Sequence, residues 1–183
     1  MDTPASLLER LKEPDALAWD RFVELYTPVL YHWTKRLGLA ENDAADLMQE
    51  VFLLLLRKLP AFHYDATQSF RAWLKTVTLN KWRELHRRRP EAAADAAPAD
   101  VADPNEADPF WEVEYRERLV GRALHIMQSE FEPATWQACW ESVVSGKPAK
   151  QVARELGITV NAVYLAKSRV LRRLHQELEG LLE

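Results

Sequence analysis

The sequence predicts an all-α protein made of two small helical domains. Apolar residues recur at helical spacing over residues 15–89 and again after residue 110, and no run of alternating β-branched residues indicates a strand. The segment between these blocks, residues 90–109, is rich in alanine, proline and acids and contains no aromatic residue. Such a composition is typical of a linker. The predicted domains are therefore 1–89 and 110–183.

Length and composition narrow the classes of protein. A chain of 183 residues suits two small domains better than one large core. Cys139 is the only cysteine, which rules out an internal disulfide and favours a reducing compartment. No Cys/His cluster has zinc-ligand spacing, and no apolar run approaches the roughly 20 residues of a membrane span. We therefore expect a cytoplasmic protein with no metal, no cofactor and no membrane insertion.

The first helical block divides into three predicted helices. Residues 15–37 carry an apolar stripe that includes Trp19, Phe22 and Tyr26, and Pro28 is expected to bend this helix. A second helix is expected to start at Glu41-Asn42-Asp43, a segment that resembles a helix cap, and to end at residue 59. A third covers residues 70–89.

The third helix combines a buried face with a polar one. Phe70, Trp73, Leu74 and Val77 follow the spacing of a buried helical face. The polar residues recur at helical spacing on another side, where amide and guanidinium groups can contact bases and phosphates. They are Thr76, Asn80, Arg83 and Arg87, followed by Arg88 and Arg89. The alternative is a solvated helix whose closing cations offset the negative end of its dipole.

Charge is distributed unevenly along the chain. The net charge of −4 argues against a nucleic-acid partner. However, residues 81–89 carry five Lys or Arg and one acid, and residues 147–175 carry seven Lys or Arg and one acid. The intervening residues 91–117 contain nine acids and one arginine. Charges interact over about 8 Å at physiological salt, so local blocks govern binding more than the total does.

The linker prediction for residues 90–109 depends on low apolar content. Four prolines occur between residues 89 and 109, and the segment cannot bury enough apolar surface to offset the entropy of ordering. A partly helical, alanine-rich surface loop is the alternative interpretation. We expect a flexible acidic linker.

The second block ends in a predicted helix-turn-helix. After helices at 110–131 and 133–144, an apolar pattern stops at Gly157, and Thr159 can cap a second helix that carries Val163, Ala166, Val170 and Leu171. An ordinary helical hairpin is the alternative. Polar residues on the outer side of the last helix could face a major groove. They are Asn161, Tyr164, Lys167, Ser168, Arg169 and Arg172, although Arg169 could instead pair with Glu155.

Two basic helical elements joined by a tether suggest that two DNA elements are bound at once. At this point the residues resemble those of extracytoplasmic-function sigma factors of bacterial RNA polymerase. The segment Asp43-Ala44-Ala45-Asp46-Leu47-Met48-Gln49-Glu50-Val51-Phe52 is similar to the family's polymerase-binding motif. Phe70 to Arg89 resembles its minus-ten element, and Val152 to Leu174 resembles its minus-thirty-five helix-turn-helix.

The resemblance implies site residues for three functions. A face of Asp43, Asp46, Gln49 and Glu50 would bind the polymerase core through its β′ clamp helices. His63 and Tyr64, with Thr76, Asn80, Arg83, Arg87, Arg88 and Arg89, would contact minus-ten DNA, although His63 and Tyr64 could equally be ordinary loop residues. The outer residues of the last helix would contact the minus-thirty-five element.

The chain departs from the family pattern at two places. Leu79 stands where the family often has arginine, and Tyr164-Leu165-Ala166 stands where it often has Lys-Ser-Arg.

The implied function is to direct core polymerase to promoters and to assist DNA opening, with no enzyme activity. Promoter DNA, the polymerase β flap and an anti-sigma factor are the other candidate partners. A stand-alone helix-turn-helix regulator of duplex DNA is the alternative. An enzyme is the third choice, since the five histidines are scattered and no glycine-rich phosphate loop is present.

Overall fold

The structure is a computed structural model that describes residues 6–62, 69–88 and 109–182. These residues form α helices and two short 3-10 helices, with no strand among them, so the predicted all-α fold is confirmed. Within the same residues no helix has both the length and the apolar character needed to cross a membrane. The elements are α1 (Leu7–Arg10), α2 (Ala16–Arg36), α3 (Glu41–Lys58), η1 (Leu59–Ala61), α4 (Phe70–Arg88), α5 (Pro109–Met127), η2 (Gln128–Glu130), α6 (Pro133–Val143), α7 (Ala149–Leu156) and α8 (Val160–Leu178).

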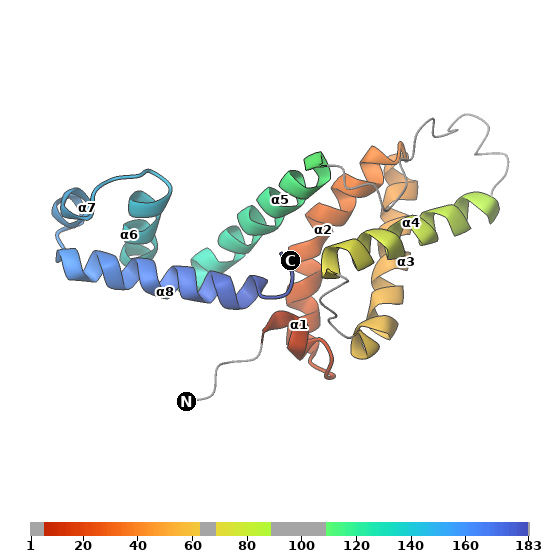
Figure 1. Cartoon of the computed structure of the whole chain (residues 1–183), viewed down its shortest axis with the longest axis horizontal. Coiled ribbons are helices and arrows are strands. Elements are labelled where there is room, and N and C mark those ends of the chain that lie inside the picture. The colour runs from red at the N-terminus through yellow and green to blue at the C-terminus, as the bar shows by residue number, and fades with distance from the viewer. Residues whose placement is uncertain (1–5, 63–68, 89–108, 183) are drawn as a thin grey trace.

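The helices are arranged as a larger body and a smaller lobe. Helices α1 to α5 form the body, whereas α6, α7 and the first part of α8 form the lobe at the opposite end (Figure 1). Helix α8 runs from the lobe to the body, so that the C-terminal end of the chain lies beside α1 and α2 (Figure 1). This places α4 and the start of α8 at opposite ends of the molecule.

Side-chain caps explain where several helices begin. Asp15 accepts a hydrogen bond from the Ala18 N–H at 2.9 Å and caps α2. The expected cap of α3 was wrong: Ala40 is its N-cap, no side chain caps it, and Glu41 is already helical. Glu41 and Asp43 instead occupy the first turn, where carboxylates interact favourably with the positive end of the helix dipole.

Pro28 is accommodated inside α2 and exposes a backbone acceptor. Because proline has no N–H, the carbonyl of Glu24 four residues earlier loses its helical donor. Arg122 of α5 donates from Nε to that carbonyl at 3.1 Å, and its NH2 lies 3.4 Å from the Glu24 carboxylate. The helix continues to Arg36, and the proline creates a contact between α2 and α5.

The main core includes helices from both sides of the predicted linker. Phe22 and Tyr26 of α2, Phe70 of α4 and Tyr115 of α5 are fully buried. Ring centroids lie 4.5 Å apart for Phe22 and Tyr26, 5.7 Å for Tyr26 and Phe70, and 6.4 Å for Tyr26 and Tyr115. Such aromatic pairs contribute about 0.5–1.5 kcal/mol each beyond the area they bury. Helix α5 is therefore part of the same core as α2 and α4.

A chain of hydroxyl groups crosses this core. The Tyr115 hydroxyl donates to the Leu181 carbonyl at 2.7 Å, and the Tyr26 and Tyr115 hydroxyls lie 2.7 Å apart. Since Tyr115 has one proton to donate, Tyr26 is the donor between the tyrosines. Burial raises the pKa of both hydroxyls, which keeps them protonated. The chain links α2, α5 and the segment after α8.

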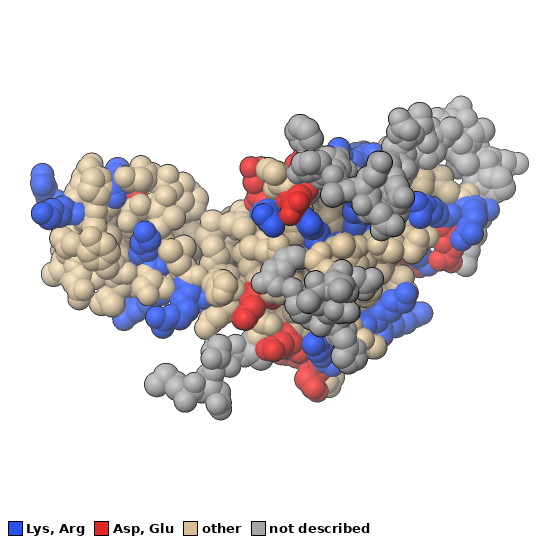
Figure 2. Space-filling view, viewed as in Figure 1, with Lys and Arg blue, Asp and Glu red and all other residues tan. Residues whose placement is uncertain are grey.

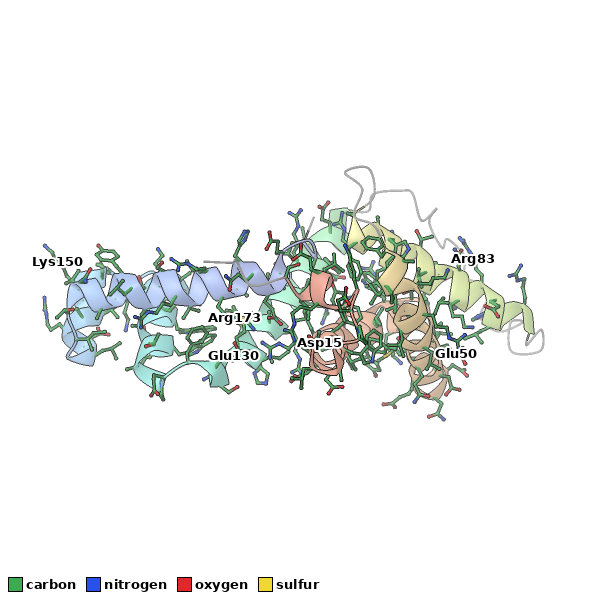
Figure 3. All side chains as sticks on the ribbon, turned by 90° about the horizontal axis from the view of Figure 1, so that it is seen from below. Asp15, Glu50, Arg83, Glu130, Lys150 and Arg173 are labelled. Atoms are coloured by element: carbon green, nitrogen blue, oxygen red, sulfur yellow. The ribbon has the colours of Figure 1, made fainter. Side chains whose placement is uncertain are left out.

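A second connection between α8 and the body is ionic. Arg21 of α2 lies 2.6 Å from both Glu177 and Glu130, and Arg173 lies 2.6 Å from Glu177 and 3.0 Å from Glu130. Arg173 and Glu130 lie near one another where α8 approaches the body (Figure 3). Glu177 is only 4% exposed, so its charge depends on both arginines.

Candidate protein and nucleic-acid interfaces

The four residues predicted to bind polymerase lie together on α3. Asp46 and Gln49 are exposed, whereas Asp43 and Glu50 are half-buried. Their spacing places Asp43, Asp46 and Glu50 on one side of the helix, while Leu47 and Val51 on another side are fully buried. The structure therefore brings these residues into one acidic and amide surface, which we call the α3 face.

The α3 face borders a cleft of about 420 Å³ between α3 and α4. Sequence reasoning missed the apolar part of this cleft, because its residues come from two helices. Besides the residues of the α3 face, the cleft is lined by Leu39, Leu47, Leu53, Trp82, Leu85 and His86. A partner with a cationic group on an apolar stem fits such a surface better than a plain anion or cation does.

An ion pair joins α3 and α4 at the cleft, and contacts within α4 hold the side chains of its wall. Lys81 of α4 lies 3.1 Å from Glu50 of α3 and 3.4 Å from Glu84. The His86 ring lies 4.4 Å from the Trp82 ring, and Nδ1 of His86 lies 3.3 Å from the Trp82 carbonyl. The Trp82 indole nitrogen is buried and has no hydrogen-bond partner among the described residues.

The polar face predicted for α4 is exposed. Thr76, Asn80, Arg83 and Arg87 are all exposed and recur at helical spacing. The Arg83 guanidinium lies 3.5 Å from the Asn80 side-chain oxygen. The Thr76 hydroxyl donates to the Ala72 carbonyl at 2.9 Å, so it is engaged within the helix. We call these four residues the α4 face.

The opposite side of α4 forms part of the core, as predicted. Phe70 and Leu74 are fully buried, Val77 is nearly so, and the half-buried Trp73 lies 4.7 Å from Phe62 between ring centroids. Leu79 is also buried, so this departure from the family pattern is a packing residue. His63, Tyr64 and Arg89 lie outside the described residues, as does the linker from 90 to 108. Arg88 ends α4, and its side chain is likewise outside the description.

Helices α7 and α8 form the predicted helix-turn-helix. Gly157 ends α7 with φ of 65°, a left-handed conformation that favours glycine. The Thr159 hydroxyl accepts a hydrogen bond from the Ala162 N–H at 3.1 Å and caps α8. A small core holds the two helices together with α6. Its buried members are Ala138, Val152, Ala153, Val163 and Ala166.

A lysine fixes α7 to α6. Lys147 lies 2.8 Å from Glu155 and 2.9 Å from Glu141, and its hydrogen bonds to Glu155 and Glu141 raise its pKa. Glu155 therefore pairs with Lys147, and the suggested pairing with Arg169 is wrong, because Arg169 points to solvent on α8. Leu171 also differs from its expected burial: it is 37% exposed, while its neighbour Val170 is buried.

The outer side of α8 carries all six predicted contact residues. Asn161, Tyr164, Lys167, Ser168, Arg169 and Arg172 are exposed. The structure adds Leu165, which is 49% exposed among them. Helical spacing already places Leu165 on the same side as Asn161, four residues earlier. Only the packing of α8, however, shows that this leucine is outside the core.

Basic residues dominate the lobe that contains the helix-turn-helix. In the view of Figure 2 the lobe shows lysine and arginine with little acid, whereas the body shows both acidic and basic residues. Five of these cations are exposed and form no ion pair within the described part of the chain. They are Lys150, Arg154, Lys167, Arg169 and Arg172.

Comparison with protein families places the α3 and α4 faces in a known domain. Residues 22–91 match the family described as sigma-70 region 2. This match includes α3, α4 and most of α2.

Similar proteins are sigma factors. The chain is 26% identical over 159 residues to the ECF RNA polymerase sigma factor SigE of Mycolicibacterium smegmatis, covering 87% of this chain and 60% of the relative. It is 26% identical over 169 residues to the ECF RNA polymerase sigma factor BldN of Streptomyces coelicolor, covering 92% of this chain and 63% of the relative. The chain thus spans less than two thirds of the length of these two relatives.

Among solved structures, CnrH in complex with the cytosolic domain of CnrY matches with a TM-score of 0.39 and 22% identity, covering 92% of each chain. The RsbN–BldN complex matches with a TM-score of 0.38 and 20% identity, covering 91% of this chain and 96% of the other. The family match at residues 22–91 includes the first two of the three predicted motifs, at 43–52 and 70–89. Residues 22–91 thus match sigma-70 region 2, and the relatives that align with 87% and 92% of the chain are ECF RNA polymerase sigma factors.

Proposed function

We propose that this protein directs core RNA polymerase to specific promoters and assists the opening of promoter DNA. The observation that carries the proposal is the division of the region 2 match into two exposed faces of different chemistry. The α3 face is acidic with an apolar cleft beside it, whereas the α4 face is polar and basic. Two faces of this kind suit a protein partner and a nucleic acid, respectively.

In this proposal the α3 face binds the β′ clamp helices of the polymerase core. Exposed carboxylates attract a basic partner and fix its orientation, while apolar surface such as Leu53 and Leu85 supplies contact area. Asp46 is the most accessible carboxylate of the face, because Glu50 already has Lys81 at 3.1 Å. A substitution at Asp46 is therefore the best test of whether the α3 face pairs with a cation of the partner.

The α4 and α8 faces bind promoter DNA. Asn80 can hydrogen-bond a base that has left the stack, and Arg83 and Arg87 can hold the phosphates on either side of it. Unstacking costs a few kcal/mol per base, and contacts with the opened strand offset this cost. The outer side of α8 holds duplex DNA in its major groove and sets the position upstream.

The proposal divides the chain by function into region 2 at 1–89, a linker at 90–109 and a helix-turn-helix domain at 110–183, whose helix α5 packs in the main core with α2 and α4. The second domain also contacts the polymerase β flap. The protein positions DNA and polymerase and makes or breaks no covalent bond. It acts in the cytoplasm, and an anti-sigma factor that covers its exposed faces is a further proposed partner.

Charge reversal at Asp46 tests polymerase docking. We expect Asp46→Arg to weaken binding to core polymerase by at least about tenfold, because like charges across an interface cost several kcal/mol. Binding is measured by fluorescence anisotropy of the labelled protein titrated with core enzyme. Asp20→Arg is the matched control, since Asp20 is an exposed carboxylate of α2 that forms no ion pair among the described residues. Equal affinity of the two variants would contradict the assignment of the α3 face.

A further inference from the structure

Leu165 lies on the outer side of α8. At 100° per residue, Asn161, Leu165, Ser168 and Arg172 fall within about 60° of one another around the helix. Val163, Ala166 and Val170 are buried on the opposite side. An apolar side chain that is 49% exposed therefore lies on a face whose other members are polar.

Packing within the protein does not account for this leucine. The small core of α6 to α8 is made by other residues, and Leu165 is not among the partly buried residues that pack against it. Single exposed leucines are common on protein surfaces, so exposure alone carries little weight. The position on α8 carries more, because Leu165 is in the second turn of the helix and the first turns of a recognition helix enter the major groove.

Exposed cations accompany Leu165 in the helix-turn-helix, and this combination favours an anionic ligand with an apolar feature. Arg169 and Arg172 follow it on α8, and Lys150 and Arg154 project from α7; all four are exposed and form no ion pair within the described residues. Lys150 lies at the far end of the lobe (Figure 3). Duplex DNA combines phosphates with the C5-methyl group of thymine, which is the main apolar feature of the major groove.

We propose that Leu165 determines sequence specificity by contacting a thymine methyl group in the upstream promoter element. The proposal rests on the proposed function, because it requires α8 to lie in the major groove. Tyr164, 60% exposed beside Leu165, widens the apolar surface toward the neighbouring base pair. Asn161 and Arg172 on either side of Leu165 then contact base edges or phosphates, and the leucine distinguishes thymine from cytosine.

Removal of a single methyl group from the DNA tests this proposal. The full chain, assembled with core polymerase, is first used to select upstream sequences from a pool of duplexes with random bases. Each thymine of the selected duplex is then replaced in turn by deoxyuridine, which lacks only the C5-methyl group. At one position we expect binding to weaken about fourfold, the effect of removing one buried methyl group.

The protein variant identifies the side chain that contacts this methyl group. Leu165→Ala should bind the thymine and deoxyuridine duplexes equally, because the contact is already absent. Leu171→Ala is the matched control on the same helix, with a leucine 37% exposed and more than one turn further along. It should keep the fourfold preference for thymine, and thermal unfolding should show that both variants fold.

The outcomes separate this inference from the proposed function. Selection of a defined sequence whose affinity is insensitive to every deoxyuridine, or a thymine preference that Leu165→Ala retains, overturns the inference and leaves the proposed function in place. Failure to select any sequence with core polymerase overturns the proposed function as well. If Leu165→Ala weakens polymerase binding without DNA, Leu165 belongs to a protein interface and the inference is wrong.

Discussion

Replacing Tyr115 by alanine is expected to lower the free energy of unfolding by about 4 kcal/mol, the cost typical of large-to-small changes at a buried aromatic residue. Tyr115 is fully buried and its ring lies 5.9 Å from that of Trp33 and 6.4 Å from that of Tyr26. The truncation also removes a hydroxyl that bonds both Tyr26 and the Leu181 carbonyl. Urea denaturation followed by circular dichroism measures the loss, and Tyr164→Ala, at an exposed tyrosine, is the control.

Phenylalanine variants separate the hydroxyl chain from the packing of the rings. Tyr115→Phe leaves two buried groups without a partner, the Tyr26 hydroxyl and the Leu181 carbonyl, and should cost about 2 kcal/mol. Tyr26→Phe removes only one donor to Tyr115 and should cost about 1 kcal/mol or less. The reverse order of the two phenylalanine variants would contradict the hydroxyl chain. A cost below about 1.5 kcal/mol for Tyr115→Ala would contradict the packing of α5 in the main core.

Replacing Glu177 by alanine is expected to lower the free energy of unfolding by about 3 kcal/mol at neutral pH, because Arg21 and Arg173 lose their buried partner. Glu177 is 4% exposed and lies 2.6 Å from both Arg21 and Arg173. Only Glu130 then remains to compensate the two guanidinium groups. Glu179→Ala, at an exposed carboxylate two residues away, should change stability little in the same denaturation measurement. Equal effects of the two changes would contradict the ionic connection between α8 and the body.

The contribution of Glu177 should disappear in acid. Burial favours the neutral carboxyl, but the hydrogen bonds and charges of Arg21 and Arg173 outweigh burial and hold the pKa of Glu177 below its usual value. The folded state therefore binds the proton less readily than the unfolded chain. The stabilisation is fully present above the unfolded pKa, about 4.3, and is lost as the pH falls through the folded pKa. The difference in stability between wild type and Glu177→Gln should shrink over that range.

Local signals in the sequence predicted the helices of this protein well. The apolar period places α2, α3 and α4 within a residue or two of their observed ends. Gly157 and Thr159 predicted the turn of the helix-turn-helix, because each acts through its own backbone or side-chain conformation. These features depend on neighbours along the chain, which a sequence displays directly.

Features that depend on distant contacts were not predictable in the same way. Tyr115 was an aromatic residue after the linker, and nothing near it in the sequence indicated that it would pack against Tyr26 and bond Leu181. The cleft beside the α3 face needed Trp82 and Leu85 from another helix. The contact of Arg122 with the carbonyl exposed by Pro28 likewise joins residues of two helices far apart in the chain.

The candidate sites show the same division. Helical spacing was sufficient to group the residues of the α3 face and the α4 face, because each group lies on one helix. It was not sufficient to distinguish Leu165 from Leu171, since burial on α8 depends on how that helix meets α6 and α7. The contacts of all these residues with polymerase and DNA stay predictions.

Transcription by purified core polymerase is the measurement that tests the central proposal most directly. Core enzyme, a library of double-stranded promoter fragments and nucleotides are combined with and without the protein, and transcript start sites are mapped. The proposal predicts specific starts only when the protein is present, with the wild-type level retained by Asp20→Arg and lost by Asp46→Arg. No specific start, together with tight and polymerase-independent binding of duplex DNA by the protein alone, would contradict it and identify a stand-alone regulator.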